Sequence, residues 1–337
     1  MSAISFREMF ERAAAMSSQE GGLARRSRKT YWLWLKAFAG FTGKAAREWR
    51  GRDVSDWMWH LDRERYSIPS RRQALCAVVW AFKRVLKVEL GTLELPTLPR
   101  ERERIRIIPS RPELARIFAG LKNPARLMAG LQYGAGLRVS EVCELRVKDI
   151  DFEALTVRVH GGKGDKDRMT QLPVRLVPAL RRWLEWRAAL HANDVADGNG
   201  YVELPGRYAV KNPGAARELG WQYVFPSAVV KDRRRWYRTP KALQADVKAA
   251  VRAAGITKTV TPHTLRAAFA THALRCGNDL ATVQELMGHE SPETTLIYIG
   301  ADGAKGVSPL DLGGDAMGAS RGLLHGASNA IAGGVQR

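Results

Sequence analysis

The sequence predicts a mostly α-helical fold with a small β-sheet, divided into a helical N-terminal domain and a larger mixed α+β domain. Through residues 1–95, apolar residues repeat at helical spacing. Residues 96–109 then combine prolines with charges of both signs, which favours an extended linker. In the larger domain, helical segments surround one strand–turn–strand pattern, residues 155–172.

Composition narrows the class of partner. A chain of 337 residues suits two domains with sizeable cores. Its net charge of +20, from 54 Lys and Arg against 34 Asp and Glu, fits a polyanion such as nucleic acid. A basic, solvated surface or an RNA-binding protein would have the same composition.

The cysteines and the apolar runs indicate the compartment. Cys76, Cys143 and Cys276 lie far apart, which argues against a disulfide framework and against a zinc site and fits a reducing cytosol. No apolar run is long enough to span a bilayer, and residues 1–20 do not read as a signal peptide. We therefore expect a cytoplasmic protein without a membrane partner.

Three helices are expected in the N-terminal domain. The first runs from Arg28, the second contains Val54 and Leu61, and the third begins near Ser70. Their aromatic residues are expected in the core. Arg71 and Arg72 stand at the start of the third helix, where backbone N–H groups are also free to meet phosphates, so both are candidate DNA ligands.

In the larger domain, residues 110–311, a Ser110–Glu113 capping box predicts the first helix. A second helix, residues 126–133, ends at a Gly-x-Gly turn that places Arg138 just before a third helix, where its guanidinium could meet an anion. Glu141, three residues on, could hold that guanidinium in place. An ordinary helix ion pair explains this pair equally well.

Residues 161–168, Gly-Gly-Lys-Gly-Asp-Lys-Asp-Arg, read as a β-hairpin turn and lack P-loop spacing. A lysine on such a turn, Lys163 or else Lys166, could donate a proton to a leaving oxygen. By itself, the pattern is as well explained by a solvated loop.

Residues 259–300 carry the densest set of chemical groups. Thr261 and Pro262 are typical of a helix start. The helix would place His263 and Arg266 on one face, where an imidazole and a planar two-point donor could meet one phosphate. A Gly-His pair at His289 and the tyrosine Tyr298 follow.

These motifs, in this order, resemble the tyrosine recombinase family. The set is Gly-x-Gly-Leu-Arg-x-Ser-Glu, Gly-Lys-Gly-x-Lys-Asp-Arg, His-x-Leu-Arg, Gly-His and Tyr, over residues 134–298. The resemblance implies a SAM-like core-binding domain followed by a catalytic domain. It also implies cleavage and rejoining of DNA strands through a 3′-phosphotyrosine intermediate, without a metal or a cofactor. A type IB topoisomerase would share the chemistry.

The resemblance also implies a role for each matching residue. Arg138 and Arg266 would bind the scissile phosphate, Lys163 would be the general acid, and Tyr298 would be the nucleophile. The two histidines would assist: His263 by accepting the nucleophile's proton or bonding the phosphate, and His289 by contacting a non-bridging oxygen. Glu141 would support Arg138.

A second resemblance, to integron integrases, rests on an extra stretch, residues 201–227. Its Lys-Asn-Pro-Gly-Ala and Trp-Gln-Tyr-Val-Phe-Pro segments are similar to that family's additional insertion, with Asn212 in place of a tyrosine. Ser308 to Asp311 resembles the family's C-terminal end. The resemblance implies a homotetramer that recombines gene cassettes between duplex attI sites and folded single-stranded attC hairpins.

Integron integrases hold extrahelical bases of attC by stacking. The candidate DNA contacts in this region are Trp221, Arg235, Trp236 and Tyr237, although Trp221 and the nearby Tyr223 could equally pack the insertion onto the domain. The chain also departs from the family pattern near these candidates and near the proposed catalytic helix: Trp236 and Tyr237 replace histidines, and Ala267 and Ala268 replace a polar pair.

Further along, Gly300 stands where the family has a histidine after the tyrosine, and residues 312–337 form a Gly-, Ala- and Ser-rich tail that is expected to be flexible. Two alternatives stay open. One is a Xer-like or phage-like recombinase that acts on duplex DNA. The other is a catalytically silent DNA-binding protein.

Overall fold

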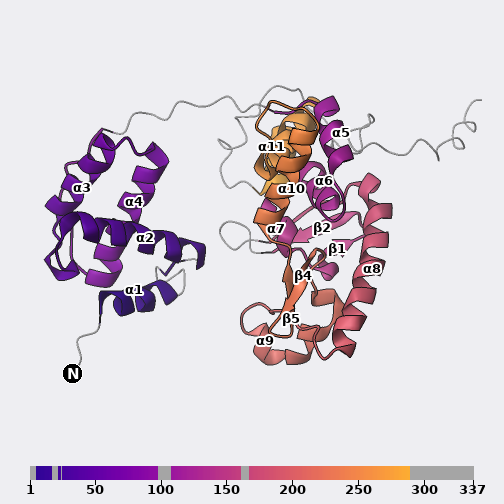
Figure 1. The fold of residues 1–337 in the computed structure, drawn as a ribbon, viewed down its shortest axis with the longest axis horizontal. Coiled ribbons are helices and arrows are strands. Elements are labelled where there is room, and N and C mark those ends of the chain that lie inside the picture. The colour runs from indigo at the N-terminus through magenta and orange to yellow at the C-terminus, as the bar shows by residue number, and fades with distance from the viewer. Residues whose placement is uncertain (1–4, 17–21, 24, 98–107, 161–166, 289–337) are drawn as a thin grey trace, which may run out of the picture. The chain divides into compact units, whose positions relative to one another are not determined.

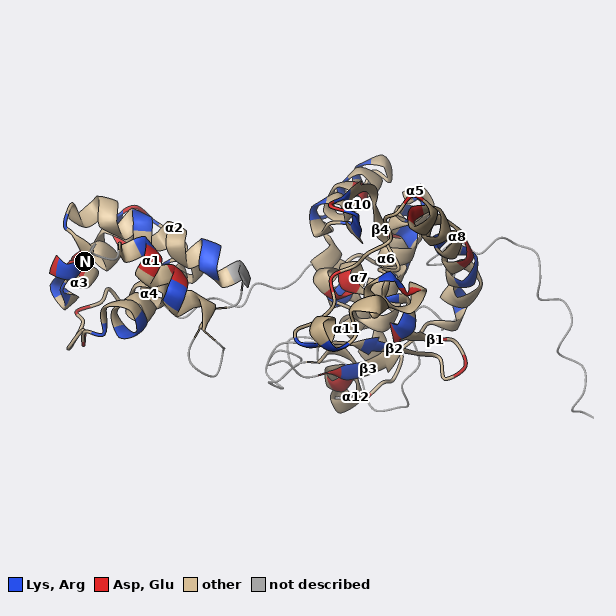
Figure 2. Cartoon of the chain, turned by 90° about the horizontal axis from the view of Figure 1, so that it is seen from below, with Lys and Arg blue, Asp and Glu red and all other residues tan. Residues whose placement is uncertain are grey.

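The computed structural model divides the chain into two compact units, residues 1–105 and 106–337 (Figure 1). Each unit has a hydrophobic core of its own. Lys and Arg residues occur on helices of both units (Figure 2). The residues that the structure describes are 5–16, 22–23, 25–97, 108–160 and 167–288.

The N-terminal unit is helical. Its described helices are α1 (Phe6–Ala15), α2 (Arg25–Thr42), α3 (Gly51–Arg63) and α4 (Ile68–Ala81), with a short 3₁₀ turn (Ala46–Glu48) and a π-helical turn (Phe82–Leu86). The three expected helices are confirmed as α2, α3 and α4. The sequence left α1 unassigned, although a capping box between Ser5 and Glu8 begins it.

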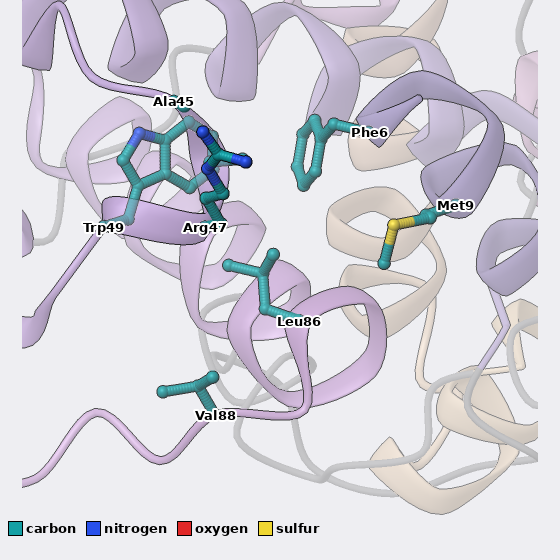
Figure 3. Close-up of a pocket in the computed structure, with 8 residues that line it drawn as sticks. Phe6, Met9, Ala45, Arg47, Trp49, Leu86 and Val88 are labelled. Carbon is teal, nitrogen blue, oxygen red and sulfur yellow. The ribbon is translucent and has the colours of Figure 1, made fainter. Parts of the chain in front are cut away.

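Aromatic rings fill the core of this unit, as expected. The ring of Phe38 lies 4.8 Å from that of Trp49 and 5.1 Å from that of Trp57, between ring centroids. At the edge of this core, a pocket of about 450 Å³ is lined mainly by apolar side chains, among them Phe6 and Met9 (Figure 3). Among the described residues that line the pocket, Arg47 is the one charged side chain, and it is 87% exposed, so these residues form no cluster of titratable groups.

The second unit combines helices with two small antiparallel sheets. Its described helices are α5 (Arg111–Gly120), α6 (Ala125–Ala135), α7 (Val139–Glu144), α8 (Val177–Ala196), α9 (Tyr208–Lys211), α10 (Pro240–Ala253), α11 (Pro262–Arg275) and α12 (Leu280–Met287). Its described strands are β1 (Ile150–Asp151), β2 (Thr156–Val159), β3 (Arg168–Gln171), β4 (Pro226–Lys231) and β5 (Arg234–Tyr237). Strands β1, β2 and β3 form one sheet in that order, and β4 pairs with β5. The mostly helical fold with a small sheet is confirmed.

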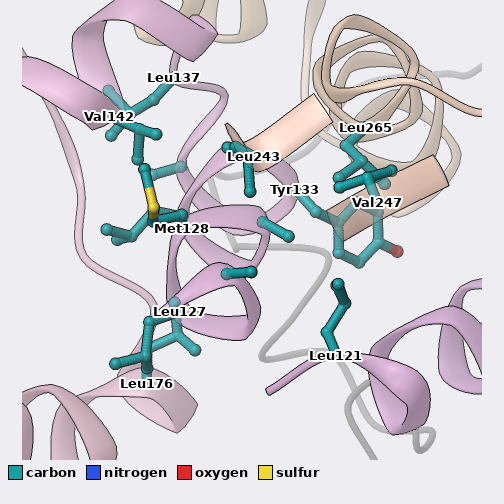
Figure 4. Packing of buried hydrophobic residues seen from close by; sticks show 14 of the residues in the cluster. Leu121, Leu127, Met128, Tyr133, Leu137, Val142, Leu176, Leu243, Val247 and Leu265 are labelled. Atoms are coloured by element: carbon teal, nitrogen blue, oxygen red, sulfur yellow. The ribbon is translucent and has the colours of Figure 1, made fainter. Parts of the chain in front are cut away.

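Helix α6 lies at the centre of the second core. Every residue from Leu127 to Ala135 is buried, and side chains of α7, α10 and α11 pack around the helix (Figure 4). The helix ends at Gly136 in a left-handed conformation, with φ of 66°. A Cβ at Gly136 would lie 2.7 Å from the ring of Phe269 on α11, so only glycine allows this close approach. The approach brings the end of α6 beside Arg266.

Helix α8 contacts residues 201–227, the candidate insertion, and β5 through a buried polar face. Arg187, His191 and Asp194 are spaced four and three residues apart, so they lie on one side of the helix. Their partners are the Tyr223 carbonyl at 3.0 Å, the Arg217 carbonyl at 2.8 Å and the Arg235 guanidinium at 2.6 Å, respectively. Burial lowers the pKa of His191, so the neutral ring donates to the Arg217 carbonyl.

The three cysteines all lie within the described ranges, and none of them forms a disulfide, as expected. No helix within those ranges has both the length and the apolar character needed to cross a bilayer.

A buried histidine makes the second unit sensitive to acid. His272 on α11 is 3% exposed, its Nδ1 lies 3.0 Å from the Tyr133 hydroxyl, and burial together with the charges of Arg111 and Arg275 lowers its pKa to about 4. The unfolded chain therefore binds this proton near pH 6.5, before the folded chain does. Stability should fall by about 3 kcal/mol as the pH drops from 6.5 to 4.

Calorimetric unfolding of this unit at several pH values would measure that loss. His272→Phe removes the titrating group, so the variant should lose about 3 kcal/mol less than the wild type over the same interval. Equal losses in the two proteins would show that other groups set the acid sensitivity.

Candidate active site

Arg138 stands at the N-cap of α7, directly after the left-handed turn at Gly136. Its backbone N–H donates to Glu141 Oε2 at 2.7 Å, and its Nη1 donates to Glu141 Oε1 at 2.6 Å. Its side chain is 30% exposed. The expected contact between Glu141 and Arg138 is therefore present, and an ordinary helix ion pair would have the same geometry.

Arg266 reaches the same carboxylate from α11, which begins at Pro262 with Thr261 as its N-cap, as expected. The side chain is 4% exposed and its Nη1 lies 3.7 Å from Glu141 Oε2. Nη1 also donates to the Gly136 carbonyl and Nη2 to the Met287 carbonyl, each at 2.5 Å. Two arginines that are 128 residues apart in the sequence thus meet at one glutamate.

A third arginine, Arg168 at the start of β3, completes the cluster. It donates from Nη1 to Glu141 Oε1 at 2.8 Å and from Nη2 to Oε2 at 2.7 Å. Burial alone would raise the pKa of Glu141, but the hydrogen bonds and charges of Arg168 and Arg138 lower it to about 2. Three guanidinium groups around one carboxylate leave a surplus of positive charge, which suits an anion.

Sequence reasoning assigned no role to Arg168. Arg168 is the last residue of the Gly-Lys-Gly-x-Lys-Asp-Arg motif, in which only the lysines were given a chemical role. Its partner Glu141 lies 27 residues earlier, a separation that carries no helical or strand periodicity.

The same arginines bind the last carbonyl groups of α12. Leu286 accepts from Arg168 at 3.1 Å, Met287 accepts from Arg266, and Gly288 accepts from Arg138 at 3.0 Å. Cations at a helix C-terminus also interact favourably with its dipole. The described chain ends at Gly288, within the cluster.

Of the other catalytic candidates, only His263 lies within the described residues. His263 is exposed and lies on the first turn of α11, three residues before Arg266. Lys163, Lys166, His289 and Tyr298 lie outside the described residues.

The predicted hairpin is confirmed as β2 and β3, which pair from Val159 with Arg168. Beside that pair, His160 Nδ1 lies 2.8 Å from Asp167 Oδ2 across the two strands, and His160 Nε2 lies 3.0 Å from Asp149 Oδ1. Lys148 contacts the same oxygen of Asp149 at 3.0 Å, and its Nζ lies 4.5 Å from the centre of the Trp221 ring. A chain of polar contacts thus joins the base of the hairpin to the insertion.

The aromatic candidates of the insertion fall into two groups. Tyr223 is 5% exposed and packs in a small core with Val202 and Leu204, which favours the packing role. Trp221, Trp236 and Tyr237 are half-buried. The Trp221 ring lies 4.8 Å from that of Tyr208, so one aromatic neighbour already contacts it.

Two candidate DNA ligands are corrected by the structure. The guanidinium of Arg235 is buried and makes a two-point ion pair with Asp194, at 2.6 Å for each bond. Arg71 is 6% exposed and pairs with Asp62. Both arginines make ion pairs within the protein, so their role is structural and they are not available to bind DNA. Arg72, beside Arg71 on α4, is exposed.

Within the described residues, no group of three or more His, Cys, Asp or Glu side chains is placed to hold a metal ion. The positive charge of the site comes from the arginine cluster.

The fold, a helical N-terminal unit followed by a mixed α and β unit, is shared with solved structures of proteins that act on DNA. The fold is similar to that of the XerH site-specific recombinase bound to difH substrate (post-cleavage complex), with a TM-score of 0.60 and 18% identity over 89% of this chain and 82% of that one. It is also similar to the Tn1549 transposon integrase in complex with transposon right end DNA, with a TM-score of 0.59 and 15% identity over 88% of this chain and 96% of that one.

The chain belongs to the phage integrase family. Residues 111–304, more than half of the chain, match the model of that family, and residues 9–92 match the family's N-terminal SAM-like domain. An integrase/recombinase of Escherichia coli is 38% identical over 302 residues, which cover 85% of this chain and 88% of that protein. Tyrosine recombinase XerA of Thermococcus onnurineus is 33% identical over 266 residues, 74% of this chain and 77% of that one. The chain is therefore a tyrosine recombinase, an enzyme that cleaves and rejoins DNA through a tyrosine intermediate.

Proposed function

We propose that this recombinase is an integron integrase, which moves gene cassettes between duplex attI sites and folded single-stranded attC hairpins. The observation that carries the proposal is the candidate insertion, residues 201–227, which packs against α8. Within it, the Trp221 ring is partly exposed and lies beside two cations, Arg146 and Lys148. Such a ring is a platform for an unpaired base, since every base has a face that can stack.

The arginine cluster would bind the scissile phosphate. Arg138 and Arg266 are fixed by one carboxylate, and guanidinium groups match the planar geometry of phosphate oxygens. As the phosphorus becomes five-coordinate, charge grows on its non-bridging oxygens, and cations that are already in place stabilise it. His289, directly after Gly288, would contact one of these oxygens.

Tyr298 would attack the phosphorus while the bond to the 5′ oxygen breaks. A free tyrosine has a pKa of about 10, so it needs activation at neutral pH. His263 would accept the phenolic proton, and Lys163, or Lys166 in its place, would give a proton to the leaving 5′ oxygen. The resulting phosphotyrosine keeps the phosphodiester's energy, so rejoining needs no nucleotide cofactor.

DNA is the proposed partner, with four copies of the chain acting on two sites. The net charge of +20 and the exposed Arg72 support binding to phosphates. Two of the similar solved structures, the XerH recombinase and the Tn1549 transposon integrase, are complexes with DNA.

A Xer-like recombinase acting on duplex sites is the second candidate. The contact between Trp221 and Tyr208 favours it, because a ring that is already packed has less surface to offer a base. A catalytically silent DNA-binding protein is the third, and it would form no covalent adduct.

One experiment separates the three. The protein is incubated with a labelled attC bottom strand, folded into its hairpin, and with the same sequence as a perfect duplex, and denaturing gels detect covalent adducts. An adduct on the hairpin supports the integron integrase, and an adduct on the duplex alone supports a Xer-like enzyme. No adduct on either probe would contradict the proposed chemistry.

Trp221→Ala tests the stacking role. If the ring holds an extrahelical base, the variant should bind the bulged hairpin more weakly by about 1–3 kcal/mol, the scale of one stacked base. Binding to a hairpin without bulges should barely change, because the phosphate contacts remain. Trp236→Ala should behave likewise if its ring replaces the histidine of the family pattern. All affinities are measured by gel shift at one salt concentration.

Trp186→Ala is the matched control. Trp186 is 47% exposed on α8 and lies against Trp183, outside the insertion, so its loss should weaken neither complex. Equal losses on bulged and unbulged hairpins for Trp221→Ala, together with a lower melting temperature, would mean that the ring only packs the insertion.

A further inference from the structure

Arg168 differs from the other two arginines of the cluster in how it meets Glu141. It alone uses both terminal nitrogens on the two carboxylate oxygens, at 2.8 and 2.7 Å. Arg138 also reaches both oxygens, through its backbone N–H and its Nη1. Arg168 donates two of the four hydrogen bonds that these two arginines make to the carboxylate, and it donates them from a different element, β3. The orientation of Glu141 therefore depends on Arg168 as well as on Arg138.

Arg168 also fixes the end of α12 against the carboxylate. Its Nε donates to the Leu286 carbonyl at 3.1 Å, so one side chain bonds both Glu141 and the last turn of the helix. Its alkyl stem packs on Gly288, where φ is 62° and a Cβ would lie 2.7 Å from Arg168 Cδ. The glycine gives the chain both its left-handed turn and the space that the arginine occupies.

Arg168 is poorly placed to touch a substrate. Its side chain is 10% exposed, against 30% for Arg138, and all three of its nitrogens already donate to protein oxygens. Its influence on the reaction must pass through the groups that it holds.

We propose that Arg168 is a positioning residue that keeps Glu141 and the end of α12 in register, so that Arg138 and Arg266 present their guanidinium groups to one phosphate. The proposal rests on the proposed function, because the alignment of these arginines affects the rate only if both bind the scissile phosphate. The proposal extends that function by connecting strand β3 of the β2–β3 hairpin, through the hydrogen bonds of Arg168, to the phosphate-binding arginines.

The test separates the rate of cleavage from the affinity for DNA. Arg168→Met keeps the length of the stem and removes the guanidinium. At saturating protein, the rate of adduct formation on the folded attC strand should fall about 100-fold, the scale of an error of about 1 Å in alignment. The dissociation constant of the same strand should stay within about threefold, because affinity is spread over many cations.

A double-mutant cycle tests whether Arg168 acts through Glu141. In a Glu141→Gln background, Arg168→Met should slow adduct formation far less than it does in the wild type, because the shared partner is already altered. Arg238→Met is the control for loss of an ion pair, since Arg238 pairs with Asp246 elsewhere in the unit and should leave the rate unchanged.

A second variant displaces Arg168 without removing its charge. Gly288→Ala places a methyl group against the arginine stem, whereas Gly255→Ala adds one at a similar φ of 64° in open space. Both variants place an alanine at a similar positive φ, so only Gly288→Ala, where the methyl group also meets Arg168, should show the large loss of rate.

Wild-type rates in Arg168→Met, or equal rates in the two glycine variants, would overturn the positioning role. Additive losses in the cycle would overturn its route through Glu141. The proposed function fails by a different result, the absence of any adduct between the wild-type protein and the folded attC strand.

Discussion

Tyr298→Phe should abolish covalent attachment to DNA while leaving the affinity for DNA nearly unchanged. The phenolic oxygen is the single proposed nucleophile, whereas binding is spread over many cations. Denaturing gels of the protein with the folded attC strand would show no retarded band, and gel shifts under native conditions would match the wild type.

Tyr133→Phe is the control for this result. It removes a hydroxyl of the same kind from the same unit, where Tyr133 contacts His272 in the core, so it should lower stability and leave the adduct intact. A denaturation-resistant adduct in Tyr298→Phe would remove Tyr298 from the mechanism.

Arg138→Lys and Arg266→Lys should each lose much of the cleavage rate. Lysine cannot make a planar two-point contact, and the loss of one transition-state donor typically costs about 2.7–4 kcal/mol. Single-turnover rates of adduct formation would measure the loss. EDTA should not change these rates, because the arginines supply the positive charge.

The structure distinguishes the two substitutions by their effect on stability. Arg266 donates to two buried carbonyl groups, so lysine leaves one of them without its donor, at a cost of about 1–3 kcal/mol. Arg138 is more exposed, and its replacement should change the melting temperature less. A near-normal cleavage rate in either variant would mean that the arginine is structural.

Local signals in the sequence predicted the parts of the site that depend on neighbouring residues. Arg138 and Glu141, which form the capping pair, are three residues apart in the sequence. The start of α11 follows from Thr261 and Pro262. The strand–turn–strand pattern likewise gave β2 and β3 to within two residues. Each of these patterns depends on backbone geometry that a few adjacent residues determine.

Partners that are distant in the sequence were not predictable in this way. Arg235 reads as a basic residue in a basic stretch, and only the folded chain shows that Asp194 takes up its charge. The prediction that Arg71 binds DNA was wrong for the same reason, because its partner Asp62 lies on another helix, α3. Arg168 was missed because the three groups that it joins come from different elements. An ionisable residue's role is set by its burial and its partner, and composition gives neither.

The buried polar face of α8 limits how the insertion can be moved between proteins. Arg187, His191 and Asp194 satisfy backbone and side-chain groups that belong to the insertion and to β5. Grafted alone onto a recombinase with an ordinary apolar helix at this place, the insertion would bring the carbonyl groups of Arg217 and Tyr223 without their donors. If β5 were moved as well, the buried guanidinium of Arg235 would also lack its carboxylate. The transferable module is therefore the insertion together with β5 and α8.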